Sequence, residues 1–80
     1  MPATADYWTR KIKRMLKAEL KARDITYGEL VARLSAIGII ETEYNIRNKL
    51  SRGRFSAVFF VQCLIAIEAQ YIYIMNDMDE

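Results

Sequence analysis

Three Ser or Thr residues, each placed just before a helical run, divide this chain of 80 residues into short helices. Thr26 is followed three residues later by Glu29, which is the spacing of a capping box. Thr42 and Ser56 occupy the same kind of position ahead of the next two runs. The chain is therefore predicted to fold as several capped helices with short connections between them.

The apolar residues have helical rather than strand-like spacing through most of the chain. Glycines end two of the runs, and an apolar stripe recurs every three or four residues before the first cap. We therefore predict an all-α fold with helices over about residues 6–23, 26–38, 42–52 and 56–69. The last of these is apolar almost all round, which is typical of a helix that is buried or shared with a partner chain. Residues 71–74 are all β-branched or aromatic, so 71–75 is predicted to be a short strand or an extended segment, with 71–80 as the tail.

Length and composition indicate one domain that is stabilised by packing alone. The chain is 52% hydrophobic, enough to fill a small core, and its single cysteine, Cys63, has no partner for an internal disulfide. The first residues lack the charged leader and apolar run of a signal peptide. The apolar stretch 55–75 contains Glu68, and a charged residue there argues against a membrane span. We expect a cytoplasmic protein that does not enter a membrane.

The third predicted helix carries the side chains that suit nucleic acid. Ile46 and Leu50 are four residues apart and can face inward, while the residues around them are Asn, Arg, Lys and Ser. Arg pairs with guanine, Asn with adenine, and Lys and Ser reach phosphates. No acidic residue occurs between Glu43 and Glu68. The competing interpretation is a solvated helix face, since surface helices are commonly rich in Lys and Arg.

Two segments of the chain resemble the lambda-repressor/Cro-like (XRE-type) helix-turn-helix superfamily. Residues 25–34, with Thr26, Leu30 and Leu34, resemble its first motif helix, and Arg52-Gly53 resembles the end of its recognition helix. The closer resemblance, over most of residues 7–70, is to a group of small uncharacterised bacterial proteins that share the pattern Asn-Ile-x-Asn-Lys-[Ile/Leu]-Ser-Arg-Gly-x-Phe-Ser. The turn between the two motif helices is longer than the superfamily's by about five or six residues, and Tyr27 stands where Gln is common.

This resemblance implies a four-helix helix-turn-helix domain that binds double-stranded DNA, most naturally as a small transcriptional regulator. The expected DNA-binding residues are Thr26, Tyr27, Tyr44, Asn45, Arg47, Asn48, Lys49, Arg52 and Arg54. The basic residues of the first helix are weaker candidates for phosphate contact: Arg10, Lys13, Arg14, Lys17 and Lys21. Charge alone leaves RNA open as the partner.

The alternative is an interaction module that dimerises or docks on another protein without nucleic acid. A homodimer is also expected, through the fourth helix and the tail, with Phe59, Ile67, Tyr71, Ile72, Tyr73 and Ile74 at the interface. The chain has few side chains suited to catalysis, because it has no His and its one Cys has no base to activate it. We expect no catalytic residues, no cofactor and no metal.

Overall fold

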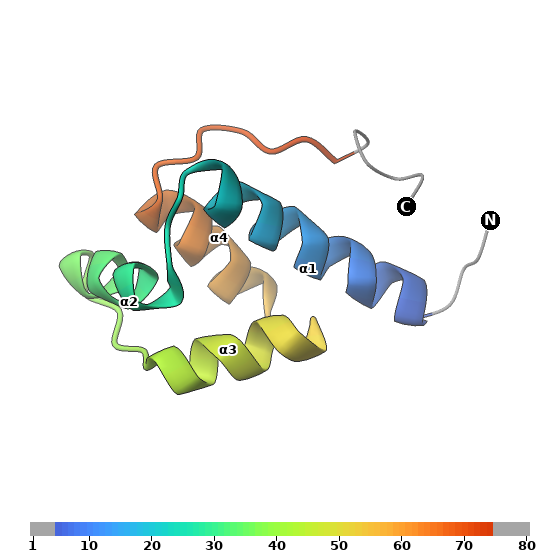
Figure 1. The fold of residues 1–80 in the computed structure, drawn as a ribbon, viewed down its shortest axis with the longest axis horizontal. Helices are drawn as coiled ribbons and strands as arrows, with labels where there is room; N and C mark the ends of the chain where they lie inside the picture. The colour runs from blue at the N-terminus through green and yellow to red at the C-terminus, as the bar shows by residue number, and fades with distance from the viewer. Residues whose placement is uncertain (1–4, 75–80) are drawn as a thin grey trace.

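The computed structural model describes residues 5–74, which form four helices and an extended tail (Figure 1). The helices are α1 (Ala5–Ala22), α2 (Tyr27–Ala36), α3 (Glu43–Arg52) and α4 (Ala57–Ala66). The predicted all-α class is thereby confirmed, and each helix falls within one residue of its expected start. Helices α2 and α4 end two or three residues earlier than expected.

The three predicted N-caps all form. The hydroxyl oxygens of Thr26, Thr42 and Ser56 accept the backbone N–H of the residue three positions later, at 3.0–3.1 Å. Each bond satisfies one of the free N–H groups of a first helical turn. These caps define where α2, α3 and α4 begin.

Three of the four helices end in the same backbone motif, which consists of a left-handed residue and a hydrogen bond from the residue after it. Asp24, Gly38 and Glu68 have φ values of 58°, 87° and 61°. The next residue then donates its N–H to a carbonyl five positions back, as Ile39 does to Leu34 at 2.9 Å. Only Gly38 predicts this turn from the sequence, because Asp and Glu adopt a positive φ at a cost in free energy. This explains why α4 stops earlier than its composition predicts.

One core holds the helices together. Its fully enclosed side chains are those of Leu16, Leu30, Leu34, Ile46, Leu50 and Cys63. They come from all four helices, and α2 packs against both α3 and α4 while α1 packs against α3. The N-terminal end of α1 projects beyond this core in Figure 1, and Trp8 is 51% exposed there. The apolar stripe of α1 is therefore buried toward its C-terminal end, at Met15, Leu16 and Leu20, and exposed at Trp8.

The segment after α4 is extended and runs back over α1 (Figure 1). No strand occurs among residues 5–74, so the strand alternative for this segment is not seen in the single chain. A lone strand has no neighbour to complete its hydrogen bonds. Its last expected residue and the rest of the predicted tail, 75–80, lie outside the described residues.

Candidate nucleic-acid interface

Helix α3 is fixed at both ends and along one side. Thr42 caps its N-terminus, and Gly53 ends it in a left-handed conformation with φ of 68°. Ile46 and Leu50 are completely buried and set the rotation of the helix about its axis. The opposite side of α3 is consequently held toward solvent in one orientation.

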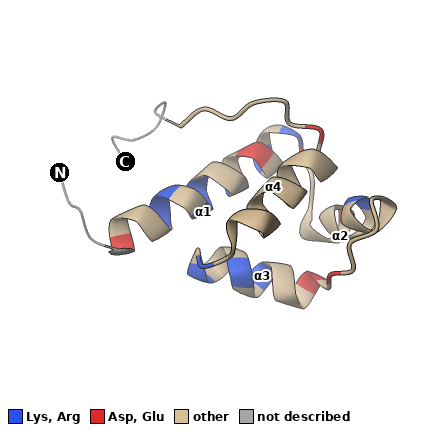
Figure 2. Cartoon of the chain, turned by 180° about the vertical axis from the view of Figure 1, so that it is seen from behind, with Lys and Arg blue, Asp and Glu red and all other residues tan. Residues whose placement is uncertain are grey.

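The solvent side of α3 presents the polar residues that the sequence singled out. Tyr44, Asn45 and Arg52 are exposed and Asn48 is half-buried; Arg54 is exposed just beyond the helix. We call Tyr44, Asn45, Arg47, Asn48, Arg52 and Arg54 the outer face of α3. Figure 2 shows Lys and Arg gathered over the C-terminal half of α3, with Glu at its start. The outer face thus combines amide groups with a positive end.

Arg47 lies on the side of α3 that faces α2. Its guanidinium carbon is 6.0 Å from the centre of the Tyr27 ring, at the start of α2. Its Nη2 is 3.9 Å from Oε1 of Glu43, one turn earlier. Both side chains of this ion pair are more than half exposed, so water screens the pair strongly. Arg47 therefore remains available to a ligand.

The side chain of Glu43, the first residue of α3, lies against the first turn of α2. Its Oε2 lies 3.1 Å from the point where a Cβ on Gly28 would stand. Thr26 and the α2 N-terminus were expected to anchor a DNA phosphate, because helix N-termini carry free N–H groups and partial positive charge. The Glu43 carboxylate places a negative charge beside that anchor. A phosphate approaching it is repelled until Glu43 swings away or is neutralised.

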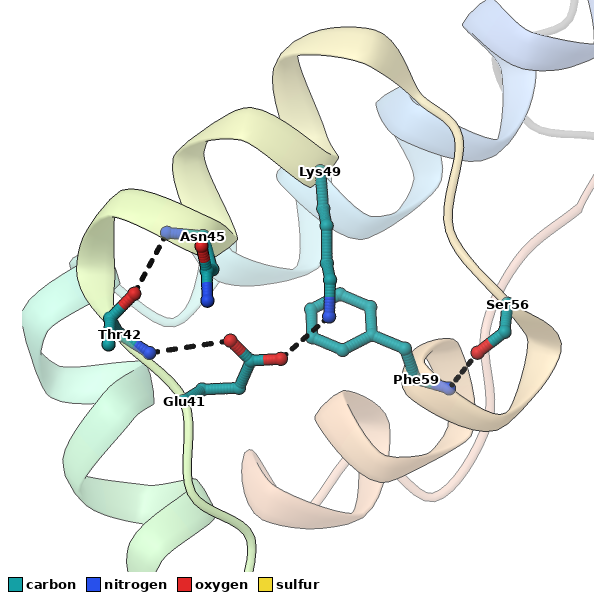
Figure 3. Close-up of polar contacts among 6 residues, drawn as sticks. All are labelled: Glu41, Thr42, Asn45, Lys49, Ser56 and Phe59. Atoms are coloured by element: carbon teal, nitrogen blue, oxygen red, sulfur yellow. Dashed lines mark hydrogen bonds and ion pairs between the residues drawn. The ribbon is translucent and has the colours of Figure 1, made fainter.

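Lys49, which was expected at the DNA interface, lies on the flank of α3 that faces Glu41 and α4, outside the outer face. Its Nζ donates to Oε2 of Glu41 at 2.6 Å and lies 4.3 Å from the centre of the Phe59 ring (Figure 3). The Glu41 side chain is only 11% exposed and also accepts the backbone N–H of Thr42. Lys49 therefore joins the turn before α3 to α4, and its charge is already matched.

Lys13, one of the basic residues of α1, is bonded to α3. Its Nζ donates to the carbonyl oxygen of Ser51 at 2.9 Å, in the last turn of α3. A cation there also complements the negative end of the helix dipole. Arg10, Arg14, Lys17 and Lys21 are exposed along α1. Lys13 thus positions α3, while Arg10, Arg14, Lys17 and Lys21 present their charge to solvent.

The residues expected at a dimer interface divide into two groups. Phe59 and Ile67 are 4% and 2% exposed and belong to the core of the single chain, so they have no surface left for a second copy. Tyr71, Tyr73 and Ile74 are exposed in the tail, and Ile72 is half-buried. Val58, Val61 and Ile65, which were not among the residues expected at an interface, are 50–65% exposed on α4. Their spacing of three and four, opposite the core residues of the same helix, is the signal that identifies them.

The single cysteine of the chain lies in the core, away from the outer face of α3. Burial raises the pKa of the Cys63 thiol from 9.0 to about 12, with a smaller opposing effect of the Lys49 charge. Such a thiol is protonated and unreactive at neutral pH. Residues 5–74 contain no group of three His, Cys, Asp or Glu side chains that could hold a metal ion. Their longest helix, α1, is too polar to cross a membrane, and the others are too short.

A family model described as a domain of unknown function (DUF6471) matches residues 8–72, so the chain belongs to this family. No curated protein and no solved structure matches the chain. The match spans all of α2, α3 and α4 and most of α1.

Proposed function

We propose that this chain, a member of the DUF6471 family, binds double-stranded DNA through the outer face of α3. The observation that carries the proposal is that Ile46 and Leu50 turn Tyr44, Asn45, Asn48 and Arg52 outward together. Helix α2 would brace against the DNA backbone while α3 enters the major groove, as in a helix-turn-helix protein. A small transcriptional regulator is the biological form that we propose.

The residues of this surface have distinct roles in the proposal. Asn45 and Asn48 can each pair with the edge of an adenine, and Arg47 can reach either a guanine or a phosphate. Arg52 and Arg54 neutralise phosphates where the outer face is most positive. Lys49 and Lys13 act through the fold, by holding α3 against the turn before it and against α1. Tyr27 supports Arg47 through its ring.

The test is fluorescence anisotropy of a labelled random-sequence DNA duplex titrated with the protein at about 50 and about 200 mM salt. If Arg47, Arg52 and Arg54 each replace one counterion, a fourfold rise in salt weakens binding by about 40-fold. Arg47→Glu and Arg52→Glu should abolish binding. Lys21→Glu is the matched control, because it makes the same change of charge at the exposed C-terminal end of α1. No binding at either salt concentration, or equal loss in the Lys21 variant, would refute the proposal.

A homodimer through α4 is the second part of the proposal. Val58, Val61 and Ile65 form one apolar strip on a helix that has no charged residue. Pairing of two copies would cover these strips and present two α3 helices to two half-sites of DNA. Light scattering should report twice the 9.3 kDa chain mass for the parent and the single mass for Val61→Asp. A single-chain mass for the parent at high concentration would remove the dimer while leaving DNA binding by one copy open to the anisotropy test.

The same strip also supports the competing function, an interaction module without nucleic acid. The two functions differ in their response to salt, because association through apolar side chains changes little between the two salt concentrations above. Dimerisation without any DNA binding would favour the interaction module.

A further inference from the structure

A cavity of about 480 Å³ lies between the C-terminal half of α1 and the extended tail. Ala18 and Ala22 of α1 form part of its wall, and their small side chains leave the space open. Glu68, Gln70, Tyr71 and Tyr73 of the tail segment complete it. The volume falls within the range of small-molecule sites. The outer face of α3 uses none of these residues.

The charged groups around this cavity favour a cation. Glu19 and Arg23 form an ion pair one helical turn apart on α1, and the Glu19 side chain is only 16% exposed. Glu68 lines the same cavity and adds a second carboxylate. Two carboxylates against one guanidinium leave a formal charge of −1 at the cavity. An anionic ligand is therefore disfavoured there.

Two tyrosine rings form a corner in the same cavity. Tyr71 and Tyr73 are two residues apart in an extended segment, so their side chains project to the same side. Their ring centres are 5.5 Å apart and their planes are inclined at 82°. Side-chain hydrogen bonding to Tyr71, followed by the charge of Tyr71, raises the pKa of Tyr73. Tyr73 consequently stays neutral at physiological pH and offers an electron-rich ring face rather than a phenolate charge.

Rings at right angles beside a carboxylate are the elements of an aromatic cage, which holds a methylated ammonium group by cation–π attraction. A primary ammonium is strongly hydrated, whereas an alkylated ammonium has an apolar surface that fits against the rings and the alanines. We propose that the Tyr71–Tyr73 corner, together with Glu68 and the Glu19–Arg23 pair of the same cavity, binds a small molecule with an alkylated ammonium group.

The cavity and the outer face of α3 lie on opposite sides of the molecule. In Figure 1 the tail crosses one edge of the bundle over α1, and α3 forms the other edge. A ligand in the cavity therefore leaves the outer face free, and the cavity can be tested in the absence of DNA. Failure of DNA binding and failure of ligand binding are independent results.

The experiment is isothermal titration of the full chain with choline and with tetramethylammonium, followed by heteronuclear NMR to locate the perturbed amides. The matched ligand control is 3,3-dimethylbutan-1-ol, which has the shape of choline without its charge. The matched protein control is Tyr44→Leu, because Tyr44 is 69% exposed on α3 and Tyr73, the ring removed in the test, is 60% exposed in the tail. We expect saturable choline binding with shifts confined to the residues that line the cavity.

Loss of one ring in Tyr73→Leu should weaken choline binding by about three- to thirty-fold, the range of a cation–π contact. Glu68→Gln should weaken it as well, while Tyr44→Leu should leave it unchanged. Circular dichroism of each variant verifies that it is folded. Three results would overturn the proposal: no saturation up to about 50 mM choline, equal binding of choline and its uncharged analogue, or unchanged choline binding in folded Tyr73→Leu.

Discussion

The position of Lys49 leads to a prediction that separates stability from DNA binding on the same helix. Lys49→Met keeps the aliphatic length of the side chain but removes the ammonium that bonds to Glu41. The carboxylate of Glu41, on a side chain 11% exposed, then loses its charged partner. The nearby Arg47→Met removes the same charge from a side chain that is 57% exposed.

The two substitutions should differ in their effect on the free energy of unfolding. A hydrogen bond to a charged group contributes about 1.5–3 kcal/mol, and the contact with the Phe59 ring contributes about 0.5–1 kcal/mol. Because the Lys49 side chain is 36% exposed, we discount this sum for solvent screening and expect a loss of about 2 kcal/mol. Arg47→Met should cost less than about 0.5 kcal/mol, as is usual for exposed ion pairs.

Urea unfolding followed by far-UV circular dichroism measures both free energies of unfolding. In thermal unfolding, the Lys49 variant of a domain of this size should melt about 8–16 °C lower than the parent. A double-mutant cycle with Glu41→Gln should give a coupling energy of about 1–2 kcal/mol. DNA binding should show the reverse order, with Arg47→Met weakened and folded Lys49→Met retaining most of its affinity. Equal stability of the two variants, or a coupling energy near zero, would refute our assignment of Lys49 to the fold.

Further predictions concern Glu43, two glycines and Cys63. Glu43→Gln removes the charge beside the first turn of α2 and should tighten DNA binding several-fold in the anisotropy assay; unchanged affinity would contradict a repulsive role for that carboxylate. Gly53→Ala should lower the free energy of unfolding by about 2–4 kcal/mol, because its Cβ would stand 2.6 Å from the Thr9 carbonyl oxygen at a positive φ. Gly38→Ala, with open space around it, should cost only about 1 kcal/mol, so equal costs in urea unfolding would argue against the close approach of α1 and α3. The pKa of Cys63 is raised in the folded state, so its contribution to stability is complete below about pH 9 and is lost as the pH rises toward about 12. A disulfide reagent at pH 8 should label Cys63 only after urea is added, and rapid labelling of the native chain would contradict its burial.

The starts of the helices could be predicted from local sequence because a cap is a local interaction. Thr26, Thr42 and Ser56 each satisfy an N–H only three residues away, so no information from distant parts of the chain is needed. The ends of α1 and α4 depend instead on Asp24 and Glu68 adopting an unfavourable backbone conformation. The packing of the residues that follow, such as the buried Ile25, offsets that cost. That compensation comes from distant residues and has no local signal.

For the candidate interface, the sequence was sufficient to place Ile46 and Leu50 inward and therefore to assign the polar side of α3, since helical periodicity relates these positions directly. It could not distinguish Lys49 from Arg47, because both flank the buried side and carry the same charge. Only the tertiary structure brought Glu41 and Phe59 to one flank and Tyr27 to the other. In the same way, composition identified α4 as almost wholly apolar, but the packing of α2 against it decided that Phe59 is buried and that Val58, Val61 and Ile65 face solvent. Local spacing determines which residues share a side of a helix, whereas the direction in which that side points depends on contacts between residues far apart in the chain.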